Sequence, residues 1–290
     1  MSGPMPGQVA PARQGYWDWR AACNFIFGGS GAGTLAYAAA VPSPSAGLGL
    51  LGLALVCCGL LCVWFEIGRP WRALHVFLHA QSSWMTRESI VALPLLVVGL
   101  GAIWYGGRWL PWFTAALALA YLYSQARMLQ GARGIPAWRH PRVVPLMIAT
   151  GLAEGAGLGI VTQLLLGPAA LPGWAALLLV GLVLVRALAF VTYLGGLGPA
   201  AAPTKARAVL AQFGRRLIGL DAVAIIAAAL GTIEPRYAWA VGLAGLVTAF
   251  AGGWFKFTLV TRAAYNQGFA LRLTPVRGAG VTRPGARPGW

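Results

Sequence analysis

The sequence predicts an all-α, polytopic integral membrane protein, folded as a bundle of eight transmembrane helices with both termini in the cytoplasm. Three observations support this fold class: the composition, a series of long apolar stretches, and a one-sided distribution of basic residues. Hydrophobic residues make up 58% of the 290-residue chain, charged residues make up 10%, and the mean hydropathy is +0.70. In an average soluble domain roughly a quarter of the residues are charged, so these values exclude a soluble domain of this length.

Eight apolar stretches approach the length needed to cross a hydrocarbon layer roughly 30 Å thick. Backbone groups in that layer find no water to bind, so each stretch is expected to be a helix. The stretches are 22–41, 47–66, 89–108, 112–130, 143–166, 174–197, 217–233 and 237–259. We expect no cleaved signal peptide, because no positively charged segment with a cleavage site precedes the first stretch.

The basic residues indicate which side of the membrane faces the cytoplasm. Nineteen of the 22 Lys and Arg residues fall on one side of the membrane. This count includes Lys256, which lies near the inner end of the last stretch and is grouped with the C-terminal tail. The connections on the other side hold only Arg108 and Arg236. Because cytoplasmic loops are enriched in Lys and Arg, the basic side is predicted to be cytoplasmic. The net charge of +16 then reflects topology rather than binding to nucleic acid.

This topology divides the chain into an N-terminal cytoplasmic segment (1–20), a membrane domain (21–260) and a basic C-terminal tail (261–290). The inner connection 66–88 is unusually polar, with two His, three Arg, two Glu and two Trp in 23 residues. Residues 71–81 are expected to form a short helix at the membrane interface. On such a helix His75 and His79 would lie one turn apart on one face.

Three ionisable residues are predicted to lie deep within spans: Glu154, Arg186 and Asp221. A lone charge in the membrane is costly and usually faces a partner or a functional path. Arg186 with either carboxylate would make a buried ion pair that joins two helices, and we favour this interpretation. The alternative is a proton path that connects a reaction site with one membrane face.

Four segments resemble the NrfD/DmsC family of membrane-anchor subunits, which belong to molybdopterin oxidoreductases of the dimethyl-sulfoxide-reductase and polysulfide-reductase kind. They are Y-W-D-W-R (16–20) before a Gly-rich first helix, I-G-R-P-W-R-A-L (67–74), S-S-W-M-T-R-E (82–88) and K-F-T-L-V-T-R-A-A-Y-N-Q-G-F (256–269). The last segment is similar to anchors of the phenylacetyl-CoA:acceptor oxidoreductase kind. The family is built on eight helices, so the resemblance in topology covers the whole chain.

The resemblance implies a non-catalytic subunit in the cytoplasmic membrane of a bacterium or archaeon. Such a subunit binds a quinone, either menaquinone or ubiquinone, and performs no substrate chemistry of its own. Its expected partners are a four-cluster, ferredoxin-like iron–sulfur subunit and a molybdopterin catalytic subunit. The predicted topology places these partners in the cytoplasm, which favours a dehydrogenase that reduces quinone.

The quinone-site candidates lie near the inner ends of the first two spans. In the connection they are Glu66, Arg69, Arg72, His75 and His79; at the entry of the first span they are Asp18, Arg20, Asn24 and Gly28. A quinone site needs hydrogen-bond donors, a proton-exchanging group and an apolar slot. A family His before the Gly-x-Pro turn is replaced here by Glu66, so either Glu66 or one of the two His residues is expected to exchange the proton.

Several alternatives remain open for these residues. His75 and His79 are equally compatible with a role at the lipid interface, the Arg residues with topology alone, and the glycines at 28–33 with close helix packing. No haem or metal is expected in this chain, because its only His residues are His75, His79 and His140. Two other functions also remain: a secondary transporter, although no internal repeat is visible, and an anchor without a quinone site.

Overall fold

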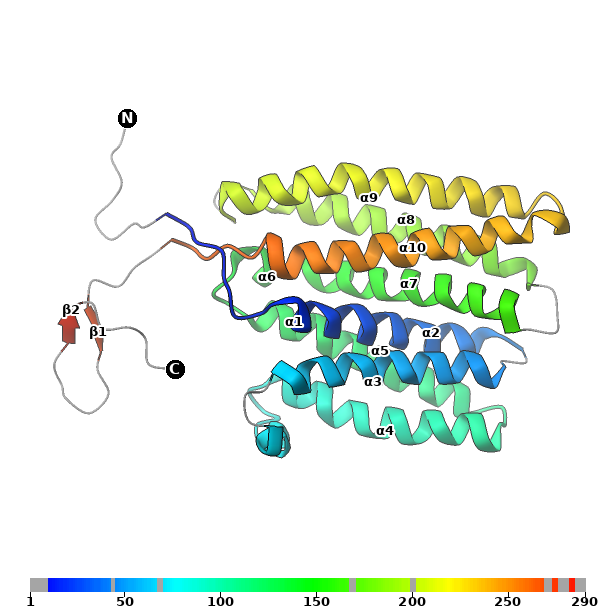
Figure 1. The fold of residues 1–290 in the computed structure, drawn as a ribbon, viewed down its shortest axis with the longest axis horizontal. Helices are drawn as coiled ribbons and strands as arrows, with labels where there is room; N and C mark the ends of the chain where they lie inside the picture. The colour runs from blue at the N-terminus through cyan, green and yellow to red at the C-terminus, as the bar shows by residue number, and fades with distance from the viewer. Residues whose placement is uncertain are drawn as a thin grey trace.

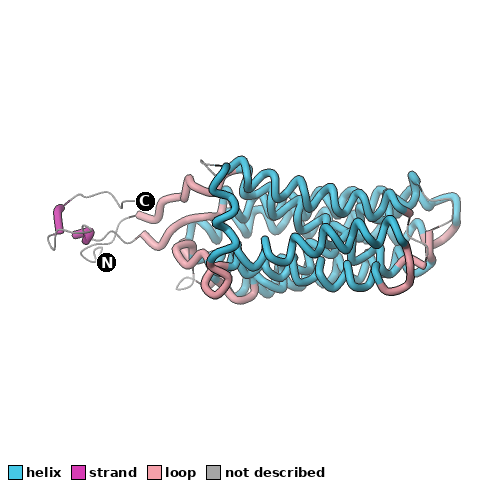
Figure 2. Tube along the Cα trace, turned by 90° about the horizontal axis from the view of Figure 1, so that it is seen from below, coloured by secondary structure: helices cyan, strands magenta, loops and turns pink. Residues whose placement is uncertain are grey.

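The computed structural model describes residues 10–42, 45–66, 70–166, 171–198, 202–268, 273–275 and 282–284. These residues form long helices that lie side by side, as Figures 1 and 2 show. The exceptions are short connections and a two-stranded antiparallel pair in the tail, β1 (Leu273–Pro275) and β2 (Thr282–Pro284). The segments that precede the first helix and follow the last one leave the bundle at the same end (Figure 1).

Eight long helical segments can be followed along the described chain. The first consists of α1 (Trp19–Cys23), a π-helical turn η1 (Asn24–Gly28) and α2 (Gly29–Ala40). The next six are α3 (Ala46–Glu66), α4 (Trp84–Tyr105), α5 (Leu110–Gly131), α7 (Val143–Leu166), α8 (Gly173–Gly196) and α9 (Thr204–Gly231). The last is α10 (Ala238–Phe257), extended by the π-helical turn η4 (Thr258–Arg262). Three short elements connect them: η2 (Pro70–Leu78), α6 (Pro136–Arg139) and η3 (Pro235–Tyr237).

Five of these segments in the described chain are long and apolar enough to cross a membrane: α3, α4, α7, α8, and α10 with η4. The prediction of an all-α, multi-pass membrane protein is therefore confirmed at this level. The remaining three long segments, which contain α2, α5 and α9, are not among these five. The count of eight spans and the cytoplasmic position of both termini stay predictions.

Helix α7 is the central helix. In its most apolar stretch of 18 residues, 72% of the residues are buried, whereas the same stretch is 28% buried in α3 and 22% buried in α4. Its glycines contact neighbouring backbones directly. A Cβ atom at Gly155 would lie 2.0 Å from the carbonyl carbon of Gly33, and one at Gly157 would lie 2.5 Å from the carbonyl oxygen of Gly245. Small residues therefore set the close approach of α2 and α10 to α7, as in other helix pairs packed in membranes.

The outer helices expose large apolar side chains along their length. Val97 on α4, Leu177 on α8 and Ile226 on α9 are 70%, 68% and 61% exposed. A water-soluble surface rarely carries so much contiguous apolar area, whereas lipid chains cover it without cost. The exposed surface thus supports the membrane assignment independently of helix length.

The polar connection after α3 differs from the sequence prediction in two ways. Helix α4 begins at Trp84, where Ser83 Oγ accepts a hydrogen bond from the backbone N–H of Thr86, so Glu88 belongs to a helix and is buried. The short helix over 71–81 is a 3₁₀ helix that ends at Leu78. His79 follows this helix, so the prediction that His75 and His79 share one face of a helix is wrong. Both His side chains are exposed.

Lys256 is also placed differently from the prediction. It was counted with the cytoplasmic tail, but η4 continues the last helix to Arg262, so Lys256 lies more than one turn inside and is fully buried. It therefore gives no information on topology. The other basic residues on that side still support the predicted orientation.

Candidate functional site

A cavity of about 140 Å³ lies where the first helix, α3, α4 and α5 meet, near the end of the bundle that carries η2. An engineered protein cavity of comparable size accommodates a benzene ring. The cavity is partly open, and two of its lining residues, Asn24 and Glu66, are polar. The remaining lining residues are Trp17, Ala21, Phe25, Val63, Met85 and Met128.

Two of the nine predicted quinone-site residues, Asn24 and Glu66, therefore line one cavity. They come from segments more than 40 residues apart, and the fold joins them because α1 packs beside the C-terminal end of α3. Asn24 is 1% exposed and begins the π-helical turn η1. Turns of this kind inside α-helices occur frequently at functional sites, because they displace one residue from the regular helical surface.

A buried carboxylate, Glu88, lies behind Asn24. The Gln125 side-chain amide donates to Glu88 Oε1 at 3.0 Å and to the backbone oxygen of Asn24 at 3.1 Å, and Asn24 Nδ2 lies 3.4 Å from the same carboxylate oxygen. The hydroxyl of Tyr121 lies 3.3 Å from Gln125 Nε2. All four side chains are at most 2% exposed. A fixed polar cluster thus adjoins the cavity, and it orients the Asn24 amide.

Gly28 lies beside this cluster rather than in the cavity wall. A Cβ atom there would be 2.4 Å from Gln125 Nε2 and 2.8 Å from the Tyr121 hydroxyl. A larger residue at this position would displace the Gln125 and Tyr121 side chains from the cluster. Gly28 is not among the residues that line the described cavity, and its contact with a ligand stays a prediction.

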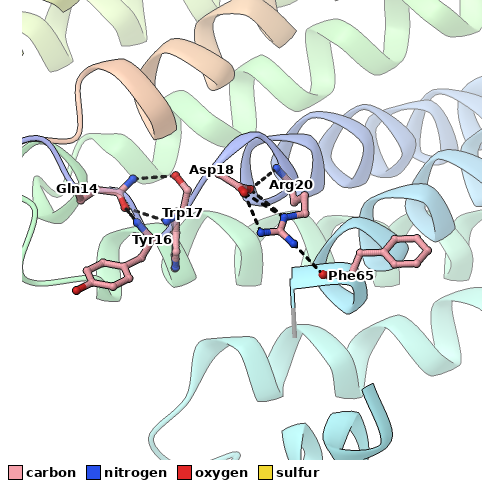
Figure 3. A network of polar contacts seen from close by, with 6 residues as sticks. All are labelled: Gln14, Tyr16, Trp17, Asp18, Arg20 and Phe65. Atoms are coloured by element: carbon pink, nitrogen blue, oxygen red, sulfur yellow. Dashed lines mark hydrogen bonds and ion pairs between the residues drawn. The ribbon is translucent and has the colours of Figure 1, made fainter. Parts of the chain in front are cut away.

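Asp18 and Arg20 hold the entry of the first helix against α3 (Figure 3). Asp18 Oδ1 accepts from the backbone N–H of Arg20 and caps α1, and its carboxylate pairs with the guanidinium at 2.9 Å. Arg20 also donates to the carbonyl of Phe65 at 3.0 Å, one of the last carbonyls of α3. The hydrogen bonds from Arg20 lower the pKa of Asp18 below its ordinary value.

The other predicted residues of the connection do not line the described cavity. Arg69 lies outside the described residues, and for Arg72 the structure describes only the backbone, in η2. His75 and His79 are exposed on and after η2 and are absent from the cavity wall. Within the described residues, no group of three or more His, Cys, Asp or Glu side chains is arranged to hold a metal ion.

The chain matches none of the known protein-family models, and it is similar to none of the curated proteins. The site is therefore interpreted from its own residues, and the resemblance to membrane anchors remains an expectation.

The three deep charges form part of a second buried array, farther along the bundle. Arg186 pairs with Asp221 and donates to the carbonyl of Thr248 at 2.8 Å. Glu154 pairs with Lys256 instead, at 2.5 Å, and accepts from the hydroxyl of Ser30 at 2.7 Å. Both pairs thus join helices: α8 to α9 and α10, and α7 to α10 and α2.

Sequence reasoning missed five residues that shape these sites: Glu88, Tyr121, Gln125, Ser30 and Lys256. The spacing of Tyr121 and Gln125 by four residues does predict that they share a helix face. Nothing local predicts that this face meets Glu88, because the contact depends on how α4 packs against α5. The arrangement as a whole offers an amide donor, a half-buried carboxylate and a ring-sized apolar space.

Proposed function

We propose that this protein is a quinone-binding membrane-anchor subunit, which passes electrons between an iron–sulfur partner and the membrane quinone pool. The observation that carries the proposal is the cavity where Asn24 and Glu66 meet Trp17, Phe25, Met85 and Met128. Its size and its lining suit a single ring with polar groups at its edge. The family resemblance of segments 16–20 and 66–88 gives independent support for the same ligand.

In this proposal Asn24 and Glu66 have different roles at the ring. The Asn24 amide, oriented by Gln125 and Glu88, donates a hydrogen bond to one ring oxygen. Glu66 is the only carboxylate in the cavity wall and exchanges protons with the other ring oxygen, since a carboxyl group can act as a general acid or base at hydrogen-bond reach. Glu66 ends α3 and is half-buried, so it can exchange protons with the aqueous side.

The apolar residues of the wall exclude water and contact the ring faces. Trp17 stacks on Trp138, with ring centroids 4.9 Å apart, and is thereby fixed at the cavity. Met85 and Met128 have unbranched, polarizable side chains that adapt to aromatic ligands. The cavity is smaller than a whole prenylated quinone, so the tail leaves through its open side into the lipid.

The proposal includes the finer topology: eight spans, both termini in the cytoplasm, and a bacterial or archaeal cytoplasmic membrane. The iron–sulfur and molybdopterin partners then dock on the basic side, where the cavity also lies. A complex that oxidises a cytoplasmic substrate and reduces quinone fits this orientation, and the chain itself contributes no substrate chemistry.

Purification tests the proposal directly. The full chain is extracted from its native membrane under mild conditions, and the co-purifying subunits and extracted lipids are identified by mass spectrometry. Iron–sulfur and molybdopterin subunits together with a stoichiometric quinone are expected. A chain that emerges with neither partner nor quinone would contradict the proposal and favour the transporter, which is the runner-up function.

The contribution of the cavity is tested by an Asn24→Leu variant in the same preparation. Its quinone content should fall at least tenfold while its subunit composition is unchanged, because leucine keeps the branched shape of the side chain but has no donor. His75→Ala is the matched control, since His75 lies on η2 away from the cavity wall, and its quinone content should equal that of the wild type.

A further inference from the structure

A second polar cavity, of about 370 Å³, lies between α9 and α10 at the end of the bundle where the N-terminal segment enters. Three arginines line it: Arg13, Arg216 and Arg262. The other lining residues are Val209, Gln212, Phe213, Trp254, Thr258 and Tyr265. We call this space the arginine cavity. It shares no lining residue with the candidate quinone cavity.

The fold brings these arginines together from three distant segments. Residues 12–14 run antiparallel to 264–266, with hydrogen bonds from Gln14 N to Ala264 O at 2.8 Å and from Asn266 N to Ala12 O at 2.9 Å. This pairing holds Arg13 beside the end of η4, which carries Arg262. Arg216 comes from α9 and lies over the Trp254 ring, with its guanidinium carbon 5.6 Å from the centroid.

The positive charge of the arginine cavity is not balanced by a carboxylate in its wall. All six Asp and Glu residues of the chain lie in the part that the structure describes, and none of them lines the cavity. The buried hydroxyl of Thr258, a lining residue that is 2% exposed, has no hydrogen-bond partner in the described structure. A cavity with three guanidinium groups and polar neighbours is suited to an anion with several oxygen acceptors, above all a phosphate.

An apolar groove of about 490 Å³ adjoins the arginine cavity and shares Trp254 with it. Its wall is formed by Ile26, Ala249, Phe250, Gly253, Trp254 and Phe257. Phe250 is 62% exposed, and it contacts Trp254 at a centroid distance of 5.7 Å. Tryptophan is enriched at the level of lipid headgroups, so the shared residue marks the boundary between headgroup and acyl chains.

We propose that the arginine cavity and the apolar groove together bind one anionic phospholipid, with its phosphate at Arg13, Arg216 and Arg262 and one acyl chain along the groove. A basic cavity alone would also suit a free phosphate or an acidic protein segment. The adjoining apolar groove favours a lipid, because a phospholipid offers a phosphate and a long hydrocarbon chain in one molecule. Basic pockets between transmembrane helices on the cytoplasmic side bind lipid headgroups in this way.

Native mass spectrometry of the full chain, reloaded with dioleoyl phosphatidylglycerol or dioleoyl phosphatidylcholine, tests the proposal. The wild type should retain one phosphatidylglycerol in preference to phosphatidylcholine. The double variant Arg216→Gln/Arg262→Gln should lose about thirty-fold in affinity for phosphatidylglycerol, as expected when two basic groups near a membrane surface are removed. The matched control is Arg133→Gln/Arg215→Gln, which removes the same charge from two exposed arginines outside the cavity and should change the affinity less than threefold.

A third variant, Ala249→Phe, fills the groove without touching the arginines. It should weaken retention of the diacyl lipid and leave binding of glycerophosphoglycerol unchanged. Three results would overturn the proposal.

Equal loss of affinity in the double variant and its control would indicate an effect of general surface charge. Displacement of the lipid by millimolar inorganic phosphate would indicate a site for a free anion. Loss of an acidic protein partner from the double variant, with lipid retention unchanged, would indicate a protein-docking surface.

Discussion

The ion pair between Glu154 and Lys256 makes a sharp prediction about stability. Both side chains are fully buried, the Nζ–Oε2 distance is 2.5 Å, and Ser30 adds a hydrogen bond to the same oxygen. The ammonium group also lies against the first helix, since a Cβ atom at Gly29 would be 2.4 Å from it, so water cannot easily replace a missing partner. Removal of one partner from a buried pair costs about 3–5 kcal/mol.

We therefore expect Glu154→Gln and Lys256→Met each to destabilise the protein by about 3–5 kcal/mol. The double variant Glu154→Gln/Lys256→Met should lie within about 1 kcal/mol of the wild type, because two neutral side chains of similar volume leave no unpaired charge. The two single losses sum to at least about 6 kcal/mol, so the resulting coupling free energy is at least about 5 kcal/mol in magnitude.

Thermal unfolding in detergent, followed by tryptophan fluorescence at one fixed scan rate, measures these effects. Each single variant should lower the Tm by roughly 10 °C, since 1 kcal/mol corresponds to about 2–4 °C in a chain of this size range. The Tm of the double variant should return close to that of the wild type. Additive losses, or single variants with an unchanged Tm, would refute the reasoning that the pair stabilises the bundle through mutual neutralisation.

Three further predictions concern the candidate site and its supports. Glu66→Gln should lower the quinone-reductase activity of the complex at least tenfold, because it removes the only carboxylate among the described residues of the cavity wall. His79→Ala should retain this activity, and equal losses in the two variants would place the proton exchange elsewhere. Gly155→Val should prevent folding, measured as the loss of a monodisperse peak in size-exclusion chromatography, because its Cβ would overlap Gly33; normal yield would contradict the packing. The lowered pKa of Asp18 predicts that hydrogen-exchange protection of residues 16–23 is constant above about pH 4 and decreases as the pH falls through the folded-state pKa. Asp18→Asn should abolish that pH dependence, and an unchanged pH profile in this variant would rule out Asp18 as its source.

The helical architecture follows from the sequence because the apolar stretches are long, and in lipid the backbone N–H and C=O groups must bond to one another, which leaves few alternatives to a helix. The same is true of the buried pair of Arg186 and Asp221, whose positions in apolar stretches require a partner. Lys256 was misplaced because a lysine close to the end of an apolar stretch resembles a topology signal. Its ammonium group is buried against Glu154 on α7, and no local pattern predicts which helix it faces.

The candidate site was only partly predictable for a similar reason. Asn24 and Glu66 each stand out locally, as polar residues at the ends of apolar stretches, and the fold brings them to one cavity. The predicted connection 66–88 includes Glu88, whereas α4 already begins at Trp84, after the Ser83 cap. The shared face of His75 and His79 is predicted from α-helical spacing, but η2 is a 3₁₀ helix that ends at Leu78, before His79.

The most direct test of the central claim is photoaffinity labelling of the purified full chain with an azido-quinone that carries a short tail, followed by mass spectrometry of the labelled peptides. The account predicts labels on the peptides that contain Asn24, Met85 and Met128, protected by excess unlabelled quinone and reduced in Asn24→Leu. Protected labels confined to other helices, with these three peptides unmodified, would contradict it.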